Sequence, residues 1–120
     1  MKRFVFLIVI VAACSKKDPT TIVVKPEQLK RVAGDADIRP DAETAKAMVA
    51  SGRTKVITSW KVCVNPDGAV DEASAIRSSG FVAWDTALAA GIKTWQFVPL
   101  LQDGDPVRAC TSYTFAWSPS

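Results

Sequence analysis

Three cysteines, Cys14, Cys63 and Cys110, are the first candidates for a chemical role in this sequence, because the 120-residue chain contains no histidine. Without histidine, the chain has no base of the kind that activates the nucleophile of a Ser-His-Asp or Cys-His site. Metal sites that use histidine are excluded for the same reason. We therefore predict no metal site and no cofactor.

Cys14 stands at the end of a segment typical of exported proteins. Residues 1–3 carry two positive charges, and Phe4–Ala13 is an uninterrupted apolar run of 10 residues. Such a run is about half as long as a membrane-spanning helix, which favours a signal peptide over residues 1–13. The sequence Val-Ala-Ala-Cys resembles a bacterial lipobox, in which the cysteine receives a diacylglycerol. We predict a lipid on Cys14, followed by a tether over residues 14–39; an ordinary secretory signal is the alternative.

Cys63 and Cys110 remain as an even pair in an exported and therefore oxidising environment, which predicts a disulfide. Two alternatives stay open at this point. The two thiols could bind a metal, although two further ligands would be needed, or they could be buried and unreactive.

The composition indicates one globular domain that does not bind nucleic acid. Of the 120 residues, 48% are apolar and 22% are charged, as in ordinary folded proteins. The 15 basic and 12 acidic residues give a formal net charge of +3, and the basic residues are scattered. Binding to phosphates normally requires clustered Lys and Arg.

The first half of the domain predicts a helix and then a β-hairpin. Residues 40–52 carry apolar side chains at helical spacing between a Pro-Asp start and Gly52; residues 25–34 predict one or two helical turns. Residues 55–64 alternate with a period of two, which is typical of a strand. The turn Asn-Pro-Asp-Gly at 65–68 then returns the chain into a second strand at 69–78.

The second half predicts a helix on a sheet. From Trp84 to Trp95 apolar residues recur at helical spacing, and Pro99 ends this region. Residues 107–117 alternate again as a third strand. Five large aromatic side chains are predicted to form the core between helix and sheet: Trp60, Trp84, Trp95, Tyr113 and Phe115.

The cysteines test this arrangement. If strands 55–64 and 107–117 are antiparallel neighbours with Cys63 opposite Cys110, then Trp60 faces Tyr113 and the two apolar faces coincide. We therefore predict an α+β fold with a three-stranded antiparallel sheet in the order 2-1-3. A crossover helix packs on one face of this sheet, an additional helix precedes it, and the third strand is an edge.

Carboxylates are the remaining candidates for catalytic residues, and we predict that the protein is not an enzyme. The candidates are Asp67, Asp71, Glu72, Asp103 and Asp105. Three of them stand in predicted turns, where Asp serves backbone geometry. Catalysis by paired carboxylates would need two of them to converge in a pocket, for which so small a domain has little room.

Several motifs resemble the C-terminal domain of the TonB energy-transducer family. They are Asn65-Pro66-Asp67-Gly68-Ala69-Val70, Ser79-Gly80-Phe81 with Asp85 and Ala89, Trp95-Gln96-Phe97-Val98-Pro99, and Asp103-Gly104-Asp105-Pro106-Val107. The resemblance assigns residues 40–120 to a TonB C-terminal-like domain. It implies a periplasmic module that binds a protein partner, such as the TonB-box peptide of an outer-membrane transporter, along the third strand.

On this resemblance the partner-binding positions are Ser112, Tyr113, Thr114, Phe115 and Ala116. The alternative is that this strand is an ordinary sheet edge, covered by the N-terminal segment or by a second copy of the chain in a homodimer.

The sequence also departs from the family. A standard TonB protein has an N-terminal transmembrane helix and a long proline-rich span, and the sequence predicts neither. Ser15 follows Cys14, whereas lipoproteins retained in the inner membrane usually have Asp there. We expect a lipid-anchored envelope protein, on the periplasmic face of the outer membrane rather than the inner one, that takes part in transport by binding a partner. The alternative is a structural or scaffolding envelope lipoprotein.

Overall fold

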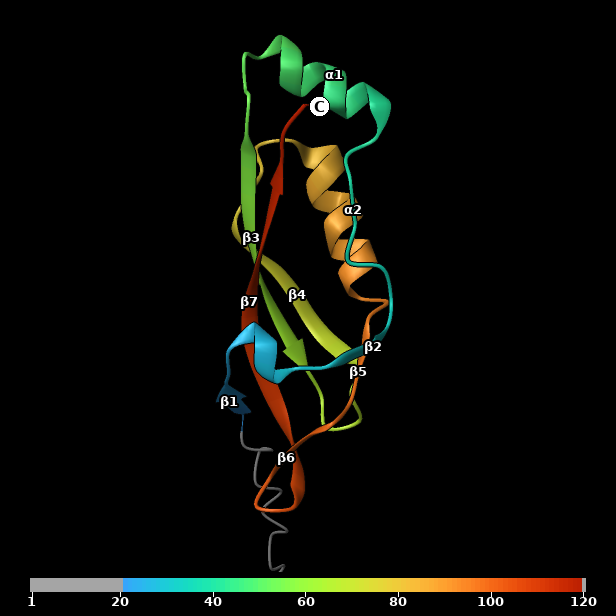
Figure 1. Ribbon diagram of the computed structural model, residues 1–120, viewed down its shortest axis with the longest axis vertical. Helices are drawn as coiled ribbons and strands as arrows, with labels where there is room; N and C mark the ends of the chain where they lie inside the picture. The colour runs from blue at the N-terminus through green and yellow to red at the C-terminus, as the bar shows by residue number, and fades with distance from the viewer. Residues whose placement is uncertain (1–20, 120) are drawn as a thin grey trace, which may run out of the picture.

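The computed structural model describes residues 21–119 (Figure 1). The predicted signal peptide, the lipid site Cys14 and residues 15–20 lie outside the described residues. The helical elements are η1 (Pro26–Gln28), α1 (Ala42–Ala50) and α2 (Val82–Ile92). The strands are β1 (Thr21–Val23), β2 (Arg31–Ala33), β3 (Val56–Val64), β4 (Val70–Arg77), β5 (Gln96–Phe97), β6 (Leu100–Gln102) and β7 (Asp105–Trp117).

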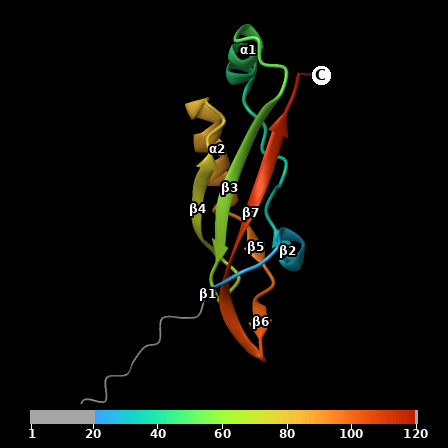
Figure 2. The ribbon, with the colours of Figure 1, turned by 90° about the vertical axis from the view of Figure 1, so that its left-hand side faces the viewer.

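The main sheet runs in the order β1-β7-β3-β4, and β6 also pairs with β7. The three long strands β4, β3 and β7 lie side by side along the molecule, as Figure 2 shows, and correspond to the predicted order 2-1-3. The sheet is larger than predicted, because the two short strands β1 and β6 extend it. A separate two-stranded sheet joins β2 to β5. Within residues 21–119, no helix is long and apolar enough to cross a membrane.

The antiparallel pairing of β3 with β7 has the predicted register. It is continuous from Val56 opposite Trp117 to Val64 opposite Ala109, and it places Trp60 opposite Tyr113. Cys63 lies opposite Cys110, and the two form a disulfide. The period-two alternation of both strands selects this register, because a shift by one residue would send each apolar set to the opposite face of the sheet.

The β3–β4 turn depends on Asn65 and Gly68. The Asn65 side-chain oxygen accepts hydrogen bonds from the backbone N–H groups of Asp67 (2.9 Å) and Ala69 (3.0 Å). Gly68 has a φ of 92°, and a Cβ atom there would meet the carbonyl oxygen of Phe97 at 2.1 Å. Only glycine fits this position, both for its backbone angle and for the close approach of the chain.

Helix α2 covers one face of the sheet and buries Trp84, Leu88 and Ile92. The helix is shorter than predicted: it ends at Ile92, because Thr94 and Trp95 donate to the carbonyls of Gly91 and Ile92 in a tighter turn. Trp95 is nevertheless 1% exposed. The core consists of Leu29, Met48, Val56, Trp60, Val62, Val64, Trp84, Leu88, Ile92, Trp95, Phe97 and Ala109.

Residues 21–39, which the sequence assigns to the tether, lie against the domain. Leu29 is 7% exposed in the core. The indole N–H groups of Trp95 and Trp84 donate to the backbone carbonyls of Asp35 (2.9 Å) and Ile38 (3.0 Å). Of the one or two helical turns predicted over residues 25–34, the chain forms one 3₁₀ turn, η1, and the following residues form the strand β2 instead. Two buried indoles thus hold a segment whose own sequence shows little periodicity.

Helix α1 begins where the sequence predicts. Asp41 is its N-cap, and its carboxylate accepts a hydrogen bond from the backbone N–H of Thr44 at 2.7 Å. This hydrogen bond holds the pKa of Asp41 below its usual value. Thr44 and Met48 are the buried residues of α1. In Figure 1, α1 and the C-terminus lie at the end of the molecule opposite β1 and β6.

Asp85, in the first turn of α2, fastens the preceding loop to the helix. Its carboxylate accepts hydrogen bonds from the Ser78 hydroxyl and from the backbone N–H of Ser79 at 3.0 Å. Burial acts to raise the pKa of Asp85, but these hydrogen bonds together outweigh it and lower the pKa below its usual value.

Because the folded pKa of Asp85 is depressed, its contribution to stability is present above the unfolded value near pH 4 and is lost as the pH falls through the lower folded value. We expect Asp85→Asn to reduce stability at pH 7 and to flatten the loss of stability below pH 4. Urea unfolding of both proteins between pH 2 and pH 7 measures this. An unchanged acid slope would show that Asp85 does not contribute.

Candidate functional site

The outer edge of β7, the side that faces away from β3, is divided into two halves. Along the first half, β1 pairs with Arg108–Cys110 in parallel. Along Ser112–Trp117, no strand of the described chain pairs with β7 on the side away from β3. The predicted edge is therefore open only in its second half, which holds all five predicted partner-binding residues.

The direction of the backbone groups follows from the cysteine pair. Cys63 and Cys110 have Cα atoms 4.0 Å apart, the close spacing of an antiparallel pair that exchanges no backbone hydrogen bonds. Cys110 therefore turns its N–H and C=O away from β3, and its carbonyl accepts a hydrogen bond from the N–H of Val24 at 3.0 Å. By alternation, Ser112, Thr114 and Ala116 also direct their backbone groups outward.

Side chains of the open half alternate between the two faces of the sheet. Ser112, Thr114 and Ala116 are exposed on the face opposite α2. Tyr113 and Phe115 are only half-buried, so they form the margin of the predicted aromatic core and not its centre. Both contact Trp95, with ring centroids 5.3 Å and 6.3 Å apart. Burial raises the pKa of Tyr113 more than the charge of Arg31 lowers it, so the phenol is neutral at pH 7.

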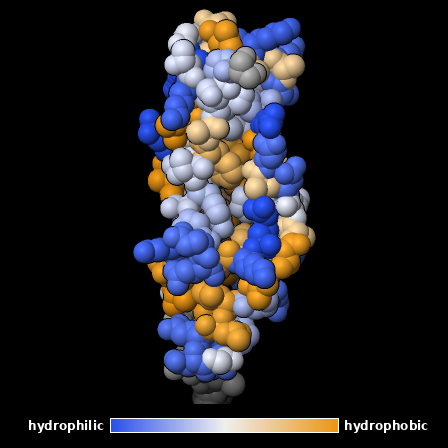
Figure 3. All heavy atoms as spheres, in the orientation of Figure 1, coloured by the Kyte–Doolittle hydropathy of each residue, from blue (hydrophilic) through white to orange (hydrophobic). Residues whose placement is uncertain are grey.

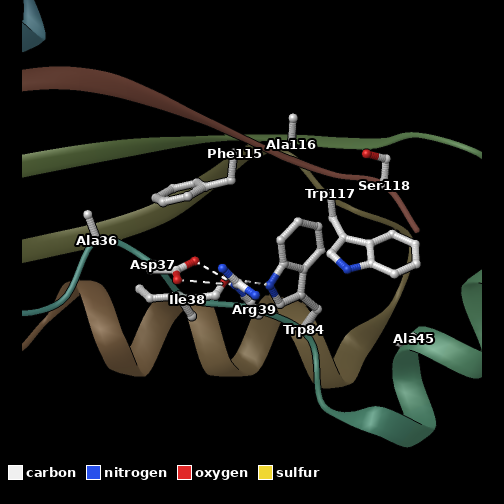
Figure 4. A pocket seen from close by; sticks show the side chains of 10 residues that line it. All are labelled: Ala36, Asp37, Ile38, Arg39, Ala45, Trp84, Phe115, Ala116, Trp117 and Ser118. Carbon is white, nitrogen blue, oxygen red and sulfur yellow. Dashed lines mark hydrogen bonds and ion pairs between the residues drawn. The ribbon is translucent and has the colours of Figure 1, made fainter. Parts of the chain in front are cut away.

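An open groove of about 600 Å³ borders this margin, on the α2 side of the sheet (Figure 4). One wall is the end of β7, where Phe115 and Trp117 point into the groove. The other walls are residues 36–39 together with Ala45 and Trp84. A strand added to the open half would direct every second side chain toward this groove.

The charged residues at the groove form a neutral pair. Arg39 Nε lies 2.9 Å from an Asp37 carboxylate oxygen, and both side chains are largely exposed. The hydrogen bond and the charge of Asp37 raise the pKa of Arg39 above its usual value. On the face shown in Figure 3, apolar residues appear in separate areas among polar ones. The groove thus combines apolar contact at Phe115 and Trp117 with a polar wall that carries a paired and therefore neutral set of charges.

The candidate catalytic carboxylates do not gather at this groove. Asp71 and Glu72 form ion pairs with Arg108, at 2.9 Å and 3.2 Å. Burial acts to raise the pKa of Glu72, but hydrogen bonds from Arg108 and Ser74 and the charge of Lys61 lower it below its usual value. No group of three or more potential metal ligands occurs within residues 21–119.

One part of the site was missed by sequence reasoning: residues 36–39 form a wall of the groove. The pairing of β1 with the first half of the edge agrees in part with the alternative stated from the sequence, in which the N-terminal segment covers the third strand. Both parts lie in the segment interpreted as a tether. The β-branched run at residues 21–24 is the one signal that could have indicated a strand there.

Comparisons with known proteins agree with this architecture. The solution NMR structure of the Pseudomonas aeruginosa TonB CTD matches with a TM-score of 0.55 and 15% sequence identity, covering 81% of this chain and 92% of that one. At this identity the match shows a shared fold. Comparison with curated protein sequences yields no match. The family described as Gram-negative bacterial TonB protein C-terminal matches residues 42–119, more than half of the chain. The chain therefore belongs to the TonB C-terminal domain family.

Proposed function

We propose that this chain binds an extended segment of a protein partner along the open half of β7, in the context of transport across the outer membrane. The observation that carries this proposal is a row of outward backbone groups at Ser112, Thr114 and Ala116 with no strand of the described chain against it. Backbone hydrogen bonds from such an edge give affinity, and alternate side-chain positions give specificity.

The family supports the kind of partner. A TonB-box peptide of an outer-membrane transporter is the partner that the resemblance implies, and the groove beside Phe115 and Trp117 gives its side chains an apolar surface. The aromatic margin therefore complements the backbone edge. We propose residues 112–116 as the partner-binding residues on both grounds.

We further propose that a lipid on Cys14 holds the domain at the periplasmic face of the outer membrane. Strand β1 begins at Thr21, seven positions after Cys14, so the connecting chain spans roughly 25 Å when fully extended. Such a short tether keeps the domain close to the membrane that carries the lipid. Transporters of the outer membrane would then lie within its reach.

Capture from detergent-solubilised outer membranes tests the function. The purified chain, immobilised through its C-terminus, is expected to retain transporters that carry an exposed periplasmic segment. Recovery of peptidoglycan, or of the chain alone, would instead support a structural envelope lipoprotein. A short peptide copying the captured transporter's periplasmic segment should compete for capture if the edge is the contact.

Cys14→Ala tests the anchor. We expect this variant to lose its lipid and to remain uncleaved or become soluble, because the thiol that accepts the diacylglycerol is absent. Detergent partition and mass spectrometry of the two proteins measure this, with Cys63→Ala/Cys110→Ala as the control that keeps the lipid site. A processed Cys14→Ala protein that still partitions with lipid would contradict the assignment.

A further inference from the structure

Strand β1 occupies the same edge of β7 that the open half continues. Its three residues pair in parallel with Arg108, Ala109 and Cys110. The N–H of Val24 then donates to the Cys110 carbonyl at 3.0 Å. The edge is therefore already bound over its first half by a segment of the same chain.

The side chains of this segment alternate sharply. Ile22 and Val24 pack against the hydrophobic core, on the same side as the groove, whereas Val23 is 85% exposed. All four residues from Thr21 to Val24 are β-branched, which suits an extended backbone. The edge thus holds a short segment by parallel backbone pairing and by two alternate apolar side chains.

Strand β1 also ends at a defined place. Pro26 has no N–H to donate, so the strand pairing stops there, and η1, held by the buried Leu29, follows while still in contact with β7. Pro26 and Ser112 border the same small pocket. Beyond this point the edge is open. A strand that continued β1 along the edge would direct its alternate side chains, as Ile22 and Val24 do, to the side of the sheet on which Phe115 and Trp117 line the groove.

We propose that β1 is an autoinhibitory segment of the β7 edge: it occupies Arg108–Cys110, and a partner strand that extends past Ser112 toward Cys110 must displace it. This inference rests on the proposed function, because it names the segment with which the partner competes.

The test uses the full chain in detergent and a synthetic peptide with the sequence of residues 20–25, Thr-Thr-Ile-Val-Val-Lys. Val24→Asp places a charge on the core side of β1 and is expected to release it, whereas Val23→Asp places the same charge in solvent and serves as the matched control. Exchange of the amide hydrogens of residues 22 and 24 measures the release.

We expect the peptide to bind at Arg108–Cys110 of the Val24→Asp protein at least 10-fold more tightly than in the unsubstituted chain or in Val23→Asp. In those two proteins, β1 competes with an effective concentration on the order of millimolar because it is covalently linked. The Cys110 amide, exposed in Val24→Asp, should regain protection from exchange on adding peptide. A peptide with serine in place of the Ile and the second Val should not restore it.

Two results would overturn the inference: a released β1 with no peptide binding at Cys110, or equal binding of the serine peptide. If Val24→Asp does not fold, Val24→Pro removes the N–H that bonds to Cys110 and keeps an apolar side chain, with Val23→Pro as its control. If this inference fails, the proposed binding of a partner at the open half around Thr114 is still not contradicted. That proposed function is tested separately, by partner capture.

Discussion

Thr114→Pro is expected to abolish partner capture while leaving the domain folded. The Thr114 backbone groups point away from β3, because Thr114 has the same parity as Cys110. Proline removes an outward donor and places a ring where an added strand would lie. We expect the affinity for the partner segment to fall by at least about 10-fold, since a lost hydrogen bond and a steric conflict act together.

Tyr113→Pro is the matched control, one residue away on the same strand. The Tyr113 N–H points toward β3, where Tyr113 lies opposite Trp60. Proline at this position breaks the central pairing of the sheet and should cost about 3 kcal/mol or more in unfolding free energy.

Thermal unfolding and partner capture, measured on both variants, separate the two effects. Thr114→Pro should keep its unfolding transition and lose capture, and Tyr113→Pro should lose stability. Full capture by a folded Thr114→Pro protein would refute edge recognition. Unfolding of Thr114→Pro together with a stable Tyr113→Pro would refute the assigned direction of the backbone groups.

Removal of the Cys63–Cys110 disulfide should produce the largest loss of stability. The two cysteines are 47 residues apart in sequence, for which loop-closure entropy predicts about 4 kcal/mol. In a domain of this size such a loss lowers the melting temperature by roughly 20 °C. We expect this shift for Cys63→Ala/Cys110→Ala, measured by circular dichroism.

Free-thiol titration supplies the control for the disulfide prediction. Under denaturant, the Cys14→Ala protein should show no titratable thiol, because its two remaining cysteines are joined. Melting that is unchanged by the double substitution, or two titratable thiols, would contradict the structural role of this pair. Reduction of the denatured protein should then yield both thiols.

Strong local patterns made the central sheet predictable. The alternation of residues 55–64 and 107–117, the Asn-Pro-Asp-Gly turn and the cysteine pair each restrict the fold independently, and together they leave one register for β3 and β7. The helix α2 was predicted too long, because Trp95 lies on the apolar stripe although it is buried from a turn. Apolar spacing reports burial, and it does not distinguish the last helical turn from a buried turn directly after the helix.

The groove could not be predicted, because its far wall is held by contacts between distant residues. Ile38 and Asp35 are fixed through their backbone carbonyls, which bond to Trp84 and Trp95. Backbone acceptors are present at every residue and leave no mark in the sequence. Covering of the β7 edge by the N-terminal segment was an alternative from the sequence, but the residues that form β1 could not be predicted, since three residues are too few to show a period.

The disulfide between β3 and β7 has a mechanical consequence for a partner strand at the open edge. A force applied along such a partner strand would act nearly parallel to β7. The backbone hydrogen bonds between the two strands would then bear the force together, in shear, and would not break one after another. The load then passes from β7 into β3 through a covalent link at Cys110. Under tension the contact with the partner would yield before the sheet that holds it comes apart.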